Sequence, residues 1–135
     1  MDAMSRTEGE FFAVKLGKLL DDHRGIDVIV MDMRSLNFWT DFFIIATVTS
    51  NTHLHGLERH IKEYVLENGL EIIQRSRKPK HDSPEHTSEE WSLLDLGNIV
   101  IHLMSAKSRQ FFELERLWGA APLIFQPESL QSSGL

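Results

Sequence analysis

The sequence predicts a single α/β domain in which a mixed β-sheet of about five strands is flanked by helices. Segments with apolar residues at helical spacing alternate with short runs rich in β-branched residues, which is typical of this fold class. The length of 135 residues fits one domain that can bury its own core. No internal repeat and no domain boundary is visible, so we expect the domain to cover residues 1–125.

The first predicted elements are one helix and two strands. Thr7-Glu8-Gly9-Glu10 is a capping-box pattern followed by apolar residues at helical spacing, which predicts a helix over residues 8–23. Residues 27–33 and 42–48 are short apolar runs, and both are expected to be strands. Because only a short loop joins these two strands, we expect them to pair antiparallel.

A second helix and a third strand follow. Residues 49–52 offer several N-cap side chains, an apolar stripe comes next, and Asn68-Gly69 is a typical helix end, so these signals predict a helix between them. Residues 70–75 are expected to form a strand. Residues 75–90 are polar and contain Pro79 and Pro84, which predicts a long mobile loop.

Residues 91–104 predict a β-hairpin. Two apolar runs flank Gly97-Asn98, which would form a two-residue turn in which glycine supplies a positive φ. Directly opposed residues share one face of the ribbon. One face is nearly all aliphatic and is expected to point to the core, with the pairs Leu96 and Ile99, Leu94 and Ile101, and Ser92 and Leu103. The other face, named here the mixed face, carries the pairs Asp95 and Val100, Leu93 and His102, and Trp91 and Met104.

The mixed face has two interpretations. An unpaired carboxylate is rarely buried in a core, so Asp95 indicates that the face is open or only partly covered. Apolar side chains such as Trp91 beside that charge are then typical of a partner-binding patch. The alternative is that a helix covers Trp91 and Leu93 while Asp95 makes a hydrogen bond at the rim. The residues alone leave both interpretations open.

The chain after the hairpin predicts a third helix, a short extended segment and a tail. Ser105 is the expected N-cap of this helix, which would carry Phe111, Leu114 and Trp118 on one side and end at Gly119. Residues 120–125 are expected to be extended. Residues 126–135 have the composition of a disordered C-terminal tail.

Composition and charge exclude several classes of function. The net charge of −6 gives no general attraction to phosphate backbones, so direct sequence-specific nucleic-acid binding is not expected, whereas a basic protein surface is a plausible partner. The chain has no cysteine, which excludes disulfides and thiol chemistry. No apolar run approaches the ~18 residues of a membrane span, and residues 1–6 lack the apolar core of a signal peptide. We therefore expect a soluble cytoplasmic protein.

The histidines do not form a recognisable metal motif. His53, His55 and His60 lack the spacing with an acidic partner that zinc enzymes use, and His81 and His86 lie in the predicted loop without cysteines. We predict no metal site and no cofactor.

The carboxylates near the first strands also lack a catalytic arrangement. Nucleotidyltransferases hold two metal ions with an Asp-x-Asp pair and cradle phosphate on a Gly-Ser turn. Here Asp32-Met33-Arg34 breaks the pair, and no Gly-Ser turn precedes it. Asp32 is instead expected to cap a turn or to pair with Arg34. No recognisable nucleophile turn or glycine-rich phosphate loop is present, so catalysis is not expected.

Five segments, in order along the chain, resemble the ribosomal silencing factor family, also called Iojap. They are DVIVMDM at 27–33, TDFFIIAT at 40–47, WSLLDLG at 91–97, VIH at 100–102 and FFELERLWGAAP at 111–122, within a match over about residues 8–125. The resemblance implies a nucleotidyltransferase-like fold without the catalytic motif. It also implies binding to ribosomal protein uL14 on the face of the large subunit where the subunits join. A bound factor would block docking of the small subunit and repress translation when nutrients are short. The resemblance further implies a homodimer when the protein is free.

The family motif coincides with the mixed face of the hairpin. The partner-binding residues that we predict are therefore Trp91, Leu93, Asp95, His102 and Met104. Trp91 is expected to insert into a pocket of the ribosomal protein and Asp95 to pair with a basic residue, while the other three complete an apolar centre. Such a factor acts by occupying a surface and needs no turnover.

Two other functions remain open at the level of the sequence. The chain could be a nucleotidyltransferase-like nucleotide-binding enzyme that uses Asp32 and Asp41. It could also be a homodimerisation module whose mixed face pairs with itself.

Overall fold

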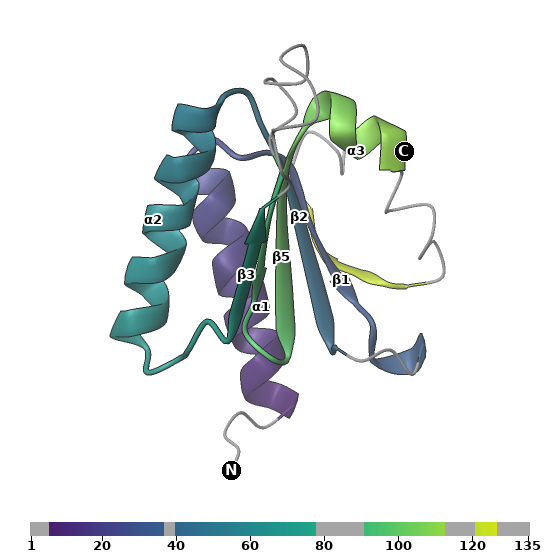
Figure 1. The fold of residues 1–135 in the computed structure, drawn as a ribbon. Helices are drawn as coiled ribbons and strands as arrows, with labels where there is room; N and C mark the ends of the chain where they lie inside the picture. The colour runs from purple at the N-terminus through teal and green to yellow at the C-terminus, as the bar shows by residue number, and fades with distance from the viewer. Residues whose placement is uncertain (1–5, 37–39, 78–90, 113–120, 127–135) are drawn as a thin grey trace.

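The computed structural model describes residues 6–36, 40–77, 91–112 and 121–126. Three helices, one 3₁₀ turn and six strands are present in these ranges (Figure 1). In chain order they are α1 (Arg6–Asp22), β1 (Ile26–Asp32), η1 (Arg34–Leu36), β2 (Phe42–Val48), α2 (Asn51–Glu67), β3 (Gln74–Arg77), β4 (Trp91–Asp95), β5 (Ile99–Ser105), α3 (Ala106–Phe112) and β6 (Leu123–Phe125).

The strands form one mixed sheet with the order β3-β4-β5-β2-β1-β6. β2 and β5 pair parallel, and every other neighbouring pair is antiparallel, including the predicted pair of β1 and β2. The α/β class and the mixed sheet are confirmed. The sheet has one strand more than the five expected, because the extended segment near the C-terminus adds to the edge beside β1 as β6.

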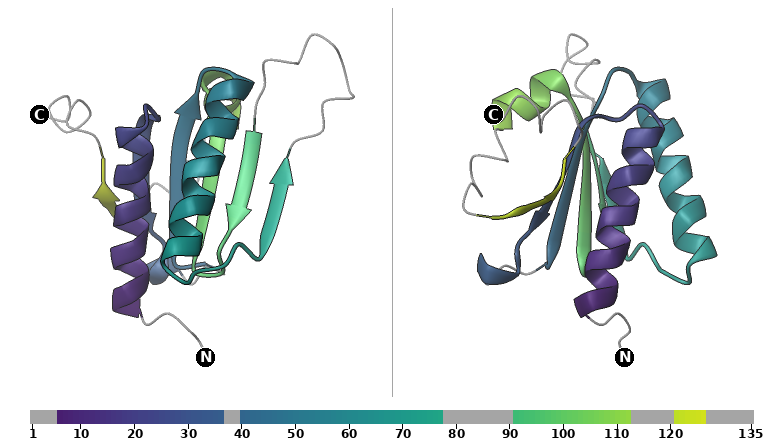
Figure 2. Two further views of the ribbon diagram at one scale, coloured as in Figure 1. Left: turned by 90° about the vertical axis from the view of Figure 1, so that its left-hand side faces the viewer. Right: turned by 180° about the vertical axis from the view of Figure 1, so that it is seen from behind.

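Helices cover both faces of the sheet. α1 and α2 lie side by side on one face, while α3 packs against β5 and β2 on the other (Figures 1 and 2). The larger core lies under α1 and α2, where Leu16 and Leu20 of α1 and Leu57 and Ile61 of α2 are fully buried. A second apolar cluster lies on the opposite face and includes Met31, Phe43, Ile45, Val100 and Met104.

The second helix begins and ends where the sequence predicts. The hydroxyl of Ser50 accepts a hydrogen bond from the backbone N–H of His53 at 3.0 Å, which satisfies a donor of the first helical turn. The predicted apolar stripe is buried through Leu54, Leu57, Ile61 and Val65. After the helix, Gly69 takes a positive φ of 70°, as glycine at a helix end commonly does.

The hairpin has the predicted register. Trp91 pairs with Met104, Leu93 with His102, and Asp95 with Val100. The Leu96 N–H donates to the carbonyl of Ile99 at 2.8 Å, and Gly97 has a φ of 97° in the turn. The face predicted to point to the core is buried, including Ser92, Leu94, Ile99, Ile101 and Leu103.

The third strand lies later in the chain than expected. We predicted it over residues 70–75, but β3 covers Gln74–Arg77, and residues 70–73 connect α2 to the sheet edge. Leu70 and Ile72 are apolar because they pack against the larger core from this connection, and not because they belong to a strand. The prediction that the loop begins at residue 75 is also wrong, and residues 78–90 of that loop lie outside the described residues.

The predicted cap of the third helix is confirmed, because the Ser105 hydroxyl accepts the N–H of Ser108 at 3.1 Å. The described part of this helix ends at Phe112, so the predicted positions of Leu114, Trp118 and Gly119 lie outside the described residues, as do residues 127–135 of the expected tail. Within the ranges that the structure describes, none of the helices combines the length and apolarity that crossing a membrane requires.

Candidate partner-binding face

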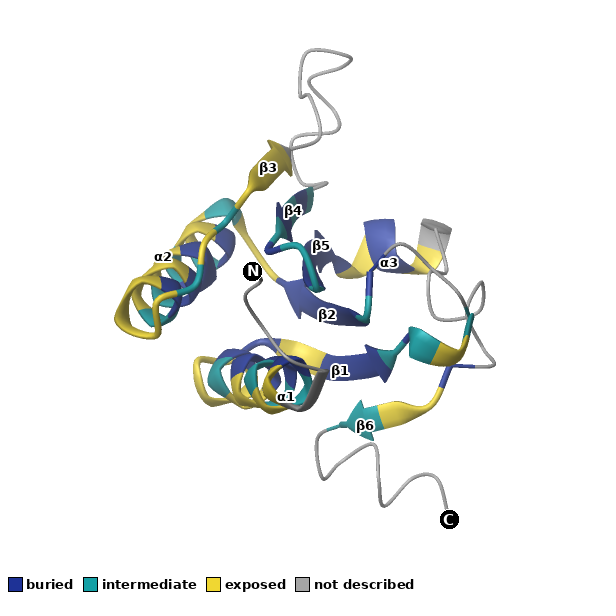
Figure 3. Ribbon diagram, turned by 90° about the horizontal axis from the view of Figure 1, so that it is seen from below, coloured by how far each residue is buried: buried dark blue, intermediate teal, exposed yellow. Residues whose placement is uncertain are grey.

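β4 presents alternate residues to the two faces of the sheet. Ser92 and Leu94 are fully buried under the helices, whereas Trp91, Leu93 and Asp95 are each half-buried on the mixed face. Figure 3 shows this alternation along β4, next to the exposed edge strand β3. The β4 half of the mixed face is therefore accessible to a partner.

The β5 half of the mixed face is buried, which corrects our expectation. His102 is 5% exposed and Met104 is fully buried. The reason is the position of β5 inside the sheet, where β4 and β2 flank it and α3 packs against it. In the free chain, His102 and Met104 therefore lie beneath the surface to which Trp91 and Leu93 contribute. Trp91 and Leu93 pack against the second apolar cluster from its edge.

His102 is an unusual buried residue. Within the described part of the chain, neither of its ring nitrogens has a hydrogen-bond partner. The ring makes an edge contact with Phe43, with centroids 5.2 Å apart. Burial away from water disfavours the charged form and lowers the pKa of His102 to about 4. The imidazole is thus a neutral, mainly space-filling group at neutral pH.

Asp95 makes the hydrogen bond that the alternative interpretation of the mixed face predicted. Its Oδ1 accepts the N–H of Gly97 at 2.7 Å, which fixes the turn of the hairpin. Its backbone carbonyl accepts the N–H of Ile73 at 2.8 Å. Asp95 therefore has a structural role, and its half-buried carboxylate lies on the same face of β4 as Leu93 and Trp91.

The edge strand β3 extends the mixed face with polar residues that the sequence analysis did not identify. Gln74 pairs with Asp95 and Ser76 pairs with Leu93, so both lie on the mixed side of the sheet and both are exposed. Arg75, which pairs with Leu94, lies on the opposite side. An apolar centre with a polar rim is the usual anatomy of a protein interface. The sequence could have identified these residues only through the position of the third strand. We predicted that strand over residues 70–75, so they were missed.

Asp32 pairs with Arg34, which was one of the two roles that we predicted for it from the sequence. The Arg34 Nε donates to Asp32 Oδ1 at 2.9 Å, and its Nη2 donates to Oδ2 at 2.6 Å. The same Nη2 reaches Glu10 Oε1 at 3.1 Å. These carboxylates raise the pKa of Arg34 above its ordinary value. In the described ranges no three histidine or carboxylate side chains are grouped to hold a metal ion.

Comparisons with known proteins agree with the resemblance in the sequence. A family model described as "Ribosomal silencing factor during starvation" matches residues 8–134. A protein of Treponema pallidum named "Ribosomal silencing factor RsfS" is 37% identical over 106 residues, which cover 78% of this chain and 88% of that protein.

Two further similarities concern a mouse protein and a solved structure. The mouse protein, named "Mitochondrial assembly of ribosomal large subunit protein 1", is 31% identical over 103 residues, which cover 76% of this chain and 43% of that protein. A crystal structure of a protein from Chromobacterium violaceum superposes with a TM-score of 0.66 at 28% identity. The superposition covers 86% of this chain and 88% of the chain in that crystal structure.

Proposed function

This chain belongs to the ribosomal silencing factor family, and on that premise we propose that it binds the large ribosomal subunit through its mixed face. The partner surface in this proposal is ribosomal protein uL14. A factor bound there blocks association with the small subunit and so represses translation when nutrients are limited. The mechanism requires occupancy of a surface and no turnover.

The observation that carries the proposal is the accessibility of Trp91 and Leu93. Both side chains are only half-buried although they pack against an apolar cluster. Tryptophan is enriched among the residues that dominate interface energies, because it buries a large apolar area and keeps a polar N–H. A partner pocket that closes over the indole would complete the burial that the free chain leaves unfinished.

The charge of the chain supports a basic partner surface. The net charge is −6, and Asp95 places one carboxylate within the mixed face. Complementary charge speeds encounter and selects the orientation of a complex. We propose that Asp95 faces a basic residue of the ribosomal protein while its Oδ1 keeps the hydrogen bond to Gly97.

Burial divides the five predicted partner-binding residues into two groups. Trp91, Leu93 and Asp95 would contact the partner directly. His102 and Met104 are buried and would instead support Trp91 and Leu93 from below. A large change at His102 or Met104 would then weaken binding through the position of Trp91.

We also propose that the free chain forms a homodimer through the same accessible residues. Trp91 and Leu93 are then protected from water when no ribosome is bound. Sedimentation of the free chain tests this state, and the Asp95→Arg variant should sediment as a monomer because it places a cation in a face that pairs with itself. An unchanged dimer in this variant would exclude the mixed face as the dimer interface.

The experiment that tests the proposed function uses purified ribosomal subunits. The chain should sediment with the large subunit and remain absent from the small subunit. Preincubation with the large subunit should reduce the joined-ribosome peak when the small subunit is added. Binding to the small subunit alone, or an unchanged joined-ribosome peak at saturating chain, would overturn the proposal.

A further inference from the structure

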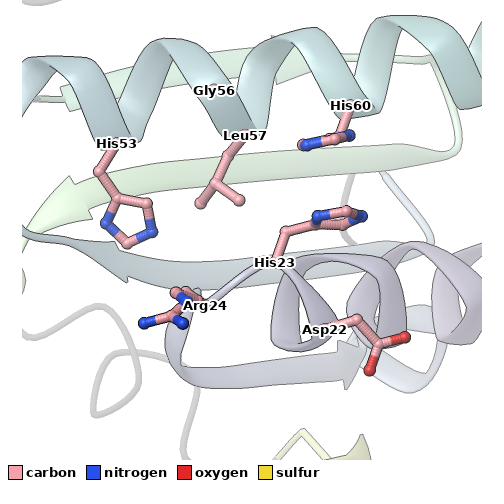
Figure 4. Close-up of a pocket in the computed structure, with 7 residues that line it drawn as sticks. All are labelled: Asp22, His23, Arg24, His53, Gly56, Leu57 and His60. Carbon is pink, nitrogen blue, oxygen red and sulfur yellow. The ribbon is translucent and has the colours of Figure 1, made fainter.

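A second candidate site lies on the helical side of the sheet, away from the mixed face. A cavity of about 230 Å³ opens between the end of α1 and the first half of α2. Figure 4 shows its lining residues, which are Asp22, His23, Arg24, His53, Gly56, Leu57 and His60. Pockets for drug-sized ligands are usually about 300–1,000 Å³ and mainly apolar. This smaller pocket, lined by histidines and an arginine, fits a small polar ligand better.

The end of α1 places two of these residues. The N–H of His23 donates to the carbonyl of Leu19 at 3.1 Å, and the N–H of Gly25 donates to that of Leu20 at 2.7 Å. Between them, Arg24 has a φ of 75°, a left-handed conformation that is uncommon for a residue with a side chain. Glycine commonly takes this conformation at a helix end. His23 and Arg24 both line the pocket together with residues of α2.

His53 supplies a hydrogen-bond donor without an acceptor. Its Nδ1 accepts the backbone N–H of Thr49 at 3.1 Å, so the proton of the neutral ring is on Nε2. Nε2 is buried and has no hydrogen-bond partner among the described residues. The ring projects from α2 toward the turn that carries Arg24 (Figure 4). An unsatisfied buried donor is costly, and a ligand oxygen would remove that cost.

His23 and His60 form a stacked pair, with centroids 3.6 Å apart and planes at 18°. Desolvation lowers the pKa of His60, and the nearby charges of His23 and Arg59 lower it further. The charge of Glu63, whose Oε1 lies 3.8 Å from His60 Nδ1, opposes this shift. Stacked rings keep their nitrogen lone pairs in parallel planes, so the two do not converge on one metal ion. A bound anion, in contrast, would favour the charged form of both rings.

We propose that this pocket binds a small oxyanion of the phosphate class, held by Arg24 and the Nε2–H of His53 and flanked by the His23–His60 pair. Arg24 carries the permanent positive charge. Asp22 is the acidic residue among the described lining residues, and Figure 4 shows its carboxylate turned away from His53. The free phosphate ion and the phosphate of a nucleotide share this chemistry. The proposal does not depend on ribosome binding.

The test follows the histidine rings of the full-length chain by nuclear magnetic resonance. Inorganic phosphate is titrated at pH 6.5, against chloride at equal ionic strength. Saturable shifts are expected at His53, His23 and His60, whereas His55, exposed on the same helix, should not move. A parallel titration with adenosine 5′-monophosphate distinguishes the two sources of phosphate, because tighter binding than that of inorganic phosphate would identify the nucleotide.

The Arg24→Gly variant separates binding from folding. Glycine suits the left-handed φ, so the variant should fold at least as well as the parent, while phosphate binding should weaken about tenfold or more. His55→Gln is the matched control and should bind phosphate normally. Equal phosphate binding by Arg24→Gly, shifts at His55 as large as those at His53, or shifts that chloride reproduces would each overturn the proposal. Saturable binding of Zn²⁺ by the three histidines with no response to phosphate would also overturn it.

Discussion

The imidazole of His102 packs against the indole of Trp91, with ring centroids 6.4 Å apart and planes at 34°. His102 lies on β5 and is buried, whereas Trp91 lies on β4 and is half-buried. The residue proposed to reach the partner thus rests on a histidine whose nitrogens have no hydrogen-bond partner within the described structure. Because the two rings are neighbours on adjacent strands, the protonation state of His102 and the position of Trp91 should be coupled.

The first prediction concerns acid stability. Burial holds the pKa of His102 at about 4 in the folded chain, below the ordinary value of 6.5 that applies to the unfolded chain. The unfolded chain therefore takes up a proton first as the pH falls, and stability is lost between about pH 6.5 and 4. The full effect of this shift is about 3 kcal/mol in the free energy of unfolding. Urea denaturation at intervals between pH 7.5 and 4 measures it.

Two variants isolate this contribution. His102→Leu removes the titrating group and two buried unpaired nitrogens, so its free energy of unfolding should change much less over the same pH range and should be no lower at pH 7. His55→Gln, at an exposed position of α2, should keep the pH dependence of the parent. If His102→Leu and the parent lose stability in parallel on acidification, His102 is not the source.

The second prediction tests Trp91 as the main partner contact. Trp91→Ala should weaken binding to the large subunit by about 2 kcal/mol or more, which is roughly a thirtyfold loss of affinity. Trp91→Phe should keep part of the affinity, because an aromatic ring still fills the pocket. Co-sedimentation at several chain concentrations measures both. Leu66→Ala is the control, since Leu66 is 80% exposed on α2 and lies on the other side of the sheet.

Trp91 also packs against the second apolar cluster, so the thermal unfolding of Trp91→Ala has to be measured alongside its binding. A folded Trp91→Ala variant that binds the large subunit as tightly as the parent would remove Trp91 from the interface.

The third prediction uses the alternation of side chains along β3. Ser76 lies beside Leu93 on the mixed side, and Arg75 lies on the opposite side of the same strand. Ser76→Glu should weaken binding to the large subunit, because a desolvated carboxylate is then forced into the interface beside Leu93. Arg75→Glu changes the net charge by more but should bind nearly normally. If Arg75→Glu weakened binding more than Ser76→Glu, the partner would lie on the side of the sheet opposite the mixed face, which would contradict our proposal.

The hairpin was predictable from the sequence because its signals are local. Glycine in the turn and apolar alternation on either side are enough to fix the register that pairs Leu93 with His102. The accessibility of the mixed face was not predictable in the same way. It depends on the parallel pairing of β2 and β5, which places His102 beside Ile45, far away in the sequence.

Buried polar contacts between distant segments were also beyond the sequence analysis. The hydroxyl of Ser92 donates to Glu58 Oε2 at 2.5 Å, and Arg109 Nη1 donates to Thr47 Oγ1 at 2.9 Å. Glu58 looks like an ordinary surface residue of α2 until β4 packs beneath it, where it is 2% exposed. The helical pattern predicts on which side of the helix a residue lies. It does not predict which residue of the facing strand will be its hydrogen-bond partner, because that depends on the tertiary arrangement.

The fourth prediction separates the two roles of Asp95. Asp95→Asn keeps an oxygen that can accept the Gly97 N–H, so its stability should stay within about 0.5 kcal/mol of the parent. Asp95→Ala removes the acceptor and should cost about 1 kcal/mol. Both variants lose the carboxylate, so both should bind the large subunit more weakly and with a smaller dependence on salt concentration. Chemical denaturation and co-sedimentation at two salt concentrations separate these effects. Parent-like affinity and salt dependence in Asp95→Asn would restrict Asp95 to its hydrogen bond in the turn.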